Sequence, residues 1–184
     1  MASVLVPLAQ GVEELEAVTV IDLLRRADMD VVTAGLDARP VKGSRGTVLL
    51  PDVTLEQALN REYDMIVLPG GQPGATHLEQ DLRIIALVKK MAATGRYTAA
   101  ICAAPKVLAR AGLLDDRRAT AFPGALDPAQ WPRIHQENRA VVTDGKIITS
   151  RGPGTAMDFA LELIELLAGK EKRDRVEAGL QRGK

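Results

Sequence analysis

The chain is poor in cysteine, histidine and aromatic residues. It has one cysteine, Cys102, and 3% aromatics among 184 residues. One cysteine excludes an internal disulfide and a zinc site built on several thiolates, and it fits a reducing cytoplasm. The two histidines, His77 and His135, are too scattered in the sequence to suggest a metal centre. We therefore expect a cytoplasmic protein that uses no metal and no cofactor.

The chain also lacks a charge surplus and a long hydrophobic run. Its 24 Lys and Arg residues equal its 24 Asp and Glu residues, which argues against strong binding to a nucleic-acid backbone. No apolar stretch reaches the roughly 18–20 residues that span a bilayer. Residues 1–7 lack the basic start of a secretory signal. We expect no membrane or nucleic-acid partner.

Short apolar runs alternate with helical patterns along the chain. With so few aromatics the core must come from Val, Leu, Ile and Ala, which suit buried parallel strands. Strand–helix alternation predicts a single α/β domain over residues 1–184, with a mostly parallel central sheet and helices on both faces. Asp144 and Gly145 predict a hairpin that adds an antiparallel piece. The expected strands are 3–8, 30–36, 47–50, 65–68, 97–101, 140–142 and 147–149, and the expected helices are 13–27, 54–57, 82–93, 103–111 and 155–167, followed by a charged, solvated tail from residue 170.

The loops after the predicted strands carry most of the reactive side chains. In a parallel sheet the carboxyl ends of the strands share one edge, so these loops meet there. An acidic cluster, a glycine pair, the lone cysteine and an arginine are therefore expected close together. The residues concerned are Glu13, Glu14, Glu16, Gly70, Gly71, Cys102 and Arg151.

Cys102 lies between a predicted strand and a predicted helix and has alanines on both sides. Small neighbours allow the tight turn of a nucleophile elbow, although the G-x-S-x-G pattern is absent. A thiolate at a helix N-terminus is stabilised by the helix dipole, so we expect a lowered thiol pKa and a reactive nucleophile. The alternative is an inert, buried cysteine.

Each of the other groups at this edge has a plain structural alternative. One of the three glutamates is expected to exchange a proton with the thiol, unless all three only complement the helix dipole. Gly70 and Gly71 either end a strand or aim a backbone amide at a developing oxyanion. Arg151, which shares a glycine-rich turn with Pro153, either binds an anion or satisfies loop carbonyls.

Taken in order, the motifs of these loops resemble the ThiJ/PfpI superfamily, and most closely its branch of bacterial YajL and the Parkinson-disease deglycase. The motifs are GVEELE at 11–16, LPGG at 68–71, AICAAP at 100–105, SRGPGT at 150–155 and LAGKE at 167–171. The similarity runs almost the full length of the chain. It implies a flavodoxin-like α/β sandwich that forms a homodimer.

The resemblance also implies a role for individual residues. Cys102 is then the nucleophile and the site of oxidation. Glu16, rather than Glu13 or Glu14, is the protonated carboxyl that meets the thiol. The backbone near Gly71 and Ala103 forms the oxyanion pocket. Arginines that lie near the site or the dimer interface in relatives are matched by Arg26 and Arg45.

One position departs from part of the superfamily. Some relatives carry a histidine just before a proline near the cysteine, whereas this chain has Phe122 before Pro123. His77 follows the glycine loop and is the other candidate for a Cys–His dyad, but we expect it, like His135, on the surface. A protease without such an acid lacks a proton donor for the leaving amine, so a proteolytic function is disfavoured.

The resemblance therefore implies an enzyme that acts on reactive dicarbonyls. It would be a cofactor-independent glyoxalase and deglycase for methylglyoxal, glyoxal and their early adducts on proteins or nucleotides. The chemistry would run through a Cys102 hemithioacetal with Glu16 as acid and base. The alternative is an oxidative-stress sensor or redox-regulated chaperone that acts through oxidation of Cys102. A third reading is a member of the fold with a silent site.

Overall fold

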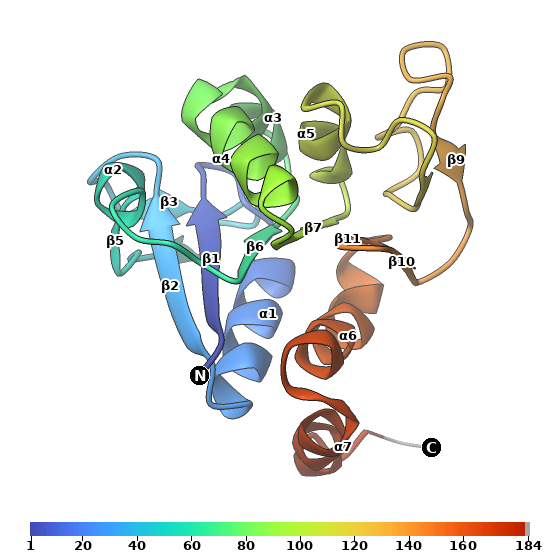
Figure 1. Ribbon diagram of the computed structural model, residues 1–184. Helices are drawn as coiled ribbons and strands as arrows, with labels where there is room; N and C mark the ends of the chain where they lie inside the picture. Colours follow the sequence, from blue (N-terminus) through green and yellow to red (C-terminus); the bar gives the residue numbers. More distant parts are fainter. Residues whose placement is uncertain (183–184) are drawn as a thin grey trace.

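The computed structural model describes residues 1–182 and is built around one seven-stranded sheet (Figure 1). All neighbouring strands in it are parallel except the pair at one edge. That antiparallel pair is the predicted hairpin at Asp144 and Gly145. The mostly parallel sheet is thereby confirmed. In spatial order the strands are β10 (Val141–Asp144), β11 (Ile147–Ser150), β7 (Tyr97–Ile101), β6 (Met65–Leu68), β1 (Ser3–Leu8), β2 (Asp30–Gly35) and β5 (Val53–Thr54).

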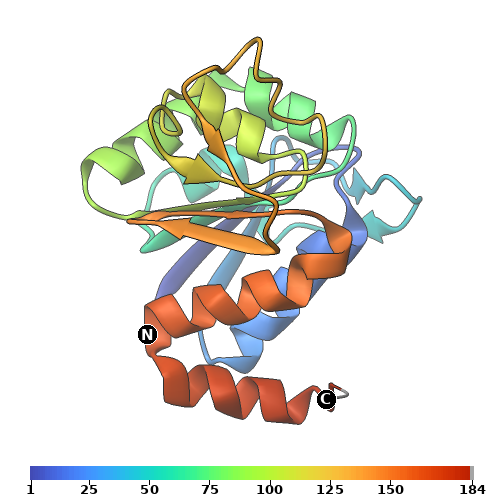
Figure 2. The ribbon, with the colours of Figure 1, turned by 90° about the vertical axis from the view of Figure 1, so that its right-hand side faces the viewer.

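Helices cover both faces of this sheet, as predicted (Figure 2). One face carries α1 (Glu14–Arg26) and α6 (Ala156–Ala168), and α7 (Lys170–Gly179) packs outside α6. The other face carries α3 (Gly74–Gln80), α4 (Leu82–Ala93) and α5 (Pro105–Arg110). The single turn α2 (Leu55–Ala58), expected at 54–57, lies beside β2 and β5 and begins with a capping box between Thr54 and Gln57. A 3-10 turn, η1 (Pro153–Thr155), precedes α6.

The core is aliphatic because both faces of the central strands are covered. Every residue of β6 is fully buried, and so are Val4, Leu5 and Val6 of β1. Such continuous apolar runs are typical of parallel strands that helices cover on both sides. Within residues 1–182, Phe159 of α6 is the only aromatic residue among the largest fully buried side chains. The expected Val, Leu, Ile and Ala core is confirmed.

Some local expectations differ from the structure. The strand expected at 47–50 is the two-residue β4 (Val48–Leu49), which pairs with β3 (Val41–Lys42) in a separate hairpin outside the main sheet. Strand β4 is short and partly exposed because the hairpin lies over α1 rather than in the core. Helix α5 begins at Pro105 instead of 103, because residues 102–104 form the turn itself. Helix α3 and the short pair β8 (Arg118–Ala119) and β9 (His135–Gln136) were not expected. Among residues 1–182, no helix is long and apolar enough to cross a membrane.

Candidate active site at the carboxyl edge of the sheet

Cys102 occupies a strained turn between β7 and α5. Its φ of 64° lies in the left-handed region, which a residue with a side chain seldom adopts. The turn is held from both sides, because the Cys102 amide donates to the Ser150 carbonyl at 2.9 Å and the Cys102 carbonyl accepts from the Phe122 amide at 2.8 Å. Strain of this kind persists only where the surroundings enforce it, and it is concentrated at functional sites. The nucleophile-elbow geometry is thereby confirmed.

Gly70, at the end of β6, is where the thiol and the carboxyl come together. The Gly70 amide donates to Oε2 of Glu16 at 2.8 Å. A Cβ atom added to Gly70 would lie 2.7 Å from the Cβ of Cys102 and 2.8 Å from Oε2 of Glu16. Neither distance leaves room for a methyl group. The position must therefore be glycine for Cys102 and Glu16 to reach each other.

Glu16 lies in the first turn of α1, and its residue surface is fully buried. Burial raises its pKa to about 7, and hydrogen bonding with the Cys102 thiol and the Gly70 amide only partly opposes that rise. Its other oxygen, Oε1, is buried and accepts no hydrogen bond within residues 1–182. A carboxyl in this setting holds a proton near neutral pH, as a general acid requires.

The Cys102 thiol is raised in pKa rather than lowered, so the sequence-based expectation is wrong on this point. Burial raises its pKa to about 12, and the charge and hydrogen bond of Glu16 add to that rise. Helix α5 is only six residues long and begins at Pro105, so its dipole does not outweigh these effects. The two groups titrate as a coupled pair, because the hydrogen bond between them enters both pKa shifts and the charge of Glu16 disfavours the thiolate.

Two backbone amides favour the ionised form of the sulfur. Hydrogen bonding from Gly71 and Ala103 lowers the pKa of Cys102, against the larger effect of burial. Gly71 has a φ of 90° and packs so tightly that an added Cβ would lie 2.3 Å from the Glu13 amide nitrogen. The amide of Gly70 is committed to Glu16 instead. Of the glycine pair, only Gly71 therefore faces the sulfur as a donor.

Comparison with known proteins identifies the family of this chain. Residues 2–166 match the DJ-1/PfpI family. The chain is 42% identical to "Protein dj-1beta" of Drosophila melanogaster over 97% of this chain and 96% of that protein. The chain belongs to the DJ-1/PfpI family.

Further DJ-1/PfpI relatives agree in sequence and fold. The crystal structure of Drosophila melanogaster DJ-1beta has a TM-score of 0.94 and covers 100% of this chain and 99% of its own. Oxidised Toxoplasma gondii DJ-1 also has a TM-score of 0.94, at 40% identity with 100% of both chains covered. A Caenorhabditis elegans relative, 35% identical over 93% of this chain and 90% of its own, is named "Glutathione-independent glyoxalase DJR-1.2".

Within residues 1–182, none of the four expected supporting residues forms a hydrogen bond with Cys102. Arg26 ends α1 and pairs with Asp22 at 2.7 Å, roughly 15 Å along the helix from Glu16. The Arg45 side chain is exposed in the β3–β4 turn. The Arg151 side chain is also exposed, although its amide donates to the Ala140 carbonyl. Pro153 opens η1 and is half-buried.

Neither histidine forms a dyad with Cys102 among the hydrogen bonds of residues 1–182. Nδ1 of His77 lies 3.0 Å from the Gln10 carbonyl, and the half-buried ring lines a separate depression beside Leu36 and Gln80. His135 is exposed on β9. Across residues 1–182, no cluster of three or more His, Cys, Asp or Glu side chains is placed to hold a metal.

Sequence reasoning named Phe122 and Glu14 but missed their supporting roles at this site. The Phe122 amide fixes the Cys102 carbonyl, while the phenyl ring is 51% exposed next to Gly152. The Glu14 carboxylate accepts hydrogen bonds from the amides of Arg45 and Thr47 and so holds the β3–β4 hairpin onto the start of α1. Backbone contacts of this kind depend on distant segments and leave no pattern in the sequence.

Proposed function

We propose that this protein is a cofactor-independent enzyme that converts reactive dicarbonyls to hydroxy acids and releases their early adducts from proteins or nucleotides. The observation that carries the proposal is the meeting of Cys102 and Glu16 at Gly70, where a nucleophile and a proton carrier share one proton. The glyoxalase named among the relatives supports the substrate class.

The proposed reaction starts with movement of the shared proton from sulfur to Glu16. The thiolate, stabilised by the amides of Gly71 and Ala103, then attacks an aldehyde carbon of methylglyoxal or glyoxal. The same amides would hold the resulting oxyanion until Glu16 returns the proton to it, which completes the hemithioacetal. The hemithioacetal contains only atoms of the thiol and the substrate, so this stage needs no further reactant.

Glu16, now a carboxylate, is placed to act as a base. It removes the proton from the carbon bonded to sulfur, which leaves an enediolate, and delivers that proton to the adjacent carbon. The hydroxyl proton moves to the oxygen of the adjacent carbon, and the product is a thioester of a hydroxy acid. Water hydrolyses the thioester and restores the thiol. The net change is addition of one water to the dicarbonyl, so no external oxidant or reductant is needed. With an early adduct, the bond from sulfur to the carbinol carbon forms as the bond to the amine, thiol or guanidine breaks, Glu16 protonates that leaving group, and the same hemithioacetal results.

Turnover of methylglyoxal tests the proposal directly. We expect purified protein to consume methylglyoxal without added thiol or metal and to form lactate. Cys102→Ser should abolish lactate formation, whereas His77→Ala should leave it unchanged. Equal rates for the wild type and Cys102→Ser would refute the enzymatic proposal.

A redox role of Cys102 is the second candidate. The observation that favours it is the environment of the sulfur. The amides of Gly71 and Ala103 and the carboxyl of Glu16, whose pKa is raised, would hydrogen-bond the oxygens of a sulfinate. Mass spectrometry after mild peroxide treatment checks it. Modification of the methionines before Cys102 would count against a sensor or a redox-regulated chaperone.

We also propose that the protein works as a cytoplasmic homodimer. Four apolar side chains on α1 and on or next to β4 are unusually exposed and form a patch. Two of them, Val18 and Leu50, border the same depression. Leu50→Glu should halve the mass measured by sedimentation, whereas Leu82→Glu on α4, also highly exposed, should not. The patch consists of Leu15 (52% exposed), Val18 (46%), Val48 (62%) and Leu50 (80%).

A further inference from the structure

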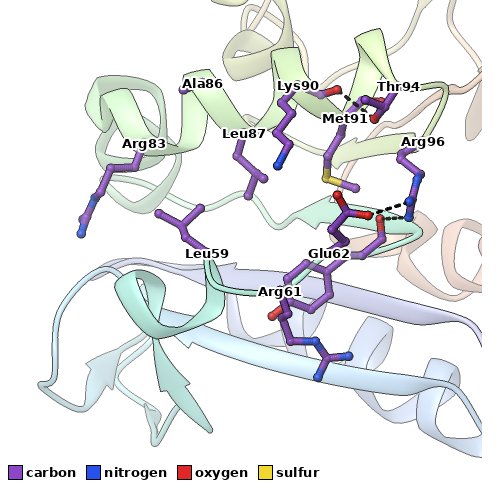
Figure 3. Close-up of a pocket in the computed structure, with 11 residues that line it drawn as sticks. Leu59, Arg61, Glu62, Arg83, Ala86, Leu87, Lys90, Met91, Thr94 and Arg96 are labelled. Atoms are coloured by element: carbon purple, nitrogen blue, oxygen red, sulfur yellow. Dashed lines mark hydrogen bonds and ion pairs between the residues drawn. The ribbon is translucent and has the colours of Figure 1, made fainter.

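A cavity lies at the opposite edge of the sheet from Cys102. It has a volume of about 530 Å³ and is formed by α4, by the segment that leads into β6 and by the residue before β7 (Figure 3). Arg96 precedes β7 and Cys102 follows it, so the two sites are roughly 20 Å apart along the strand. A volume of this size suits a small organic ligand.

The cavity has an apolar part formed by two elements. Figure 3 shows Leu59 and Leu87 pointing toward each other across it, with Met91 projecting from the same side of α4 as Leu87. Leu59 is 39% exposed, although it is a large apolar residue. Tyr63 also lines the cavity, and its buried hydroxyl has no hydrogen-bond partner within residues 1–182. An apolar ligand would cover surface that water now contacts.

The charges around the cavity are unequal. Arg61 pairs with Asp30 at 2.6 Å, Arg83 pairs with Asp81 at 2.6 Å, and Arg96 pairs with Glu62 at 3.1 Å. Lys90 is the remaining cation of the lining, and it makes no ion pair with any residue in the range 1–182. Figure 3 shows its amine directed into the cavity between α4 and the 59–62 segment. The lining therefore offers one uncompensated positive charge beside an apolar surface.

We infer that this cavity binds a monomeric amphipathic anion, a carboxylic acid with an apolar chain or ring. The chain would lie against Leu59, Leu87 and Met91, and the carboxylate would pair with Lys90. Because the arginines already have carboxylate partners, Lys90 is the charge that a ligand would meet. Charge complementarity therefore favours an anion over a neutral or cationic ligand of the same shape. This site does not depend on the chemistry of Cys102.

Titration with decanoate below its micelle concentration tests the inference. We expect one decanoate per chain, and at least tenfold weaker binding of 1-decanol and of decyltrimethylammonium. Amide NMR shifts should concentrate at residues 59–63 and 86–96. Lys90→Gln should weaken decanoate binding about tenfold and leave decanol binding unchanged. Lys89→Gln removes the neighbouring charge, which does not line the cavity, and should have no effect.

Three outcomes would overturn the inference. Equal affinity for decanoate and decanol would remove the role of charge. Equal weakening by Lys90→Gln and Lys89→Gln would show that only the general surface potential matters. NMR shifts centred on Cys102, or spread evenly over the chain, would place the ligand elsewhere.

Discussion

Gly70 and Cys102 approach each other so closely that a methyl group at Gly70 would lie 2.7 Å from the cysteine Cβ. Since the Gly70 amide also binds Glu16, this contact sets the distance between nucleophile and proton carrier.

Gly70→Ala should disable the site while the fold survives. The added methyl group forces Cys102 and Glu16 apart, and overpacking of this kind destabilises a protein by about 1–3 kcal/mol. We expect methylglyoxal turnover to fall at least 100-fold, with a urea midpoint only moderately lowered. Gly154→Ala is the matched control, because no atom lies within 4 Å of its added Cβ. Full activity in Gly70→Ala would contradict the proposed geometry.

The elements that position this pair were largely predictable from the sequence. Aliphatic runs at β1, β6 and β7 and the small residues around Cys102 predicted the sheet and the turn, because both depend on local composition. Convergence of the loops at one edge follows from parallel topology alone.

The titration of the pair was not predictable in the same way. A local pattern suggests that a helix start lowers the pKa of a thiol, but the direction at Cys102 is decided by burial and by Glu16, which is distant in sequence. The β3–β4 hairpin was equally hidden, because its two-residue strands are held by Glu14 rather than by an apolar pattern. Long-range contacts of this kind require the folded structure.

Glu16→Gln should separate the reactivity of the thiol from turnover. Removing the carboxylate charge removes a cause of the raised Cys102 pKa, so iodoacetamide should alkylate Cys102 faster at pH 8 in the variant. Turnover should nevertheless fall about 10²–10⁴-fold, the usual contribution of a general acid or base. Glu13→Gln is the control and should change the alkylation rate much less. Slower alkylation in Glu16→Gln would show that Glu16 does not act on the thiol through its charge.

The stability of the protein should depend on pH through Glu16. Its pKa is raised from 4.5 to about 7 in the folded state, so folding favours the protonated form. The associated stability is fully present below pH 4.5 and is lost as pH rises through about 7, a change of about 3 kcal/mol. Urea unfolding at pH 4.5 and pH 8 should show this loss in the wild type. Glu16→Gln should lack that component, and an identical pH dependence in both proteins would contradict the assignment.

Glu14 should stabilise the β3–β4 hairpin with the opposite pH dependence. Burial raises its pKa, but hydrogen bonds from its own amide, those of Thr47 and Arg45, and the Ser44 hydroxyl outweigh burial and lower the pKa overall. A lowered pKa contributes stability above the ordinary value of 4.5 that is lost as pH falls. Glu14→Gln should therefore speed hydrogen exchange of the Arg45 and Thr47 amides at pH 7.

The internal control for that exchange measurement is the Gly43 amide, which donates to Thr47 within the hairpin itself. It should keep its protection relative to Arg45, because the hairpin loses its attachment to α1 before it loses its own pairing. We expect the whole protein to lose about 1 kcal/mol of stability, because the Gln amide keeps one acceptor oxygen but lacks the charge that strengthens these hydrogen bonds. Unchanged exchange at Arg45 and Thr47 would show that β4, and not Glu14, holds the turn in place.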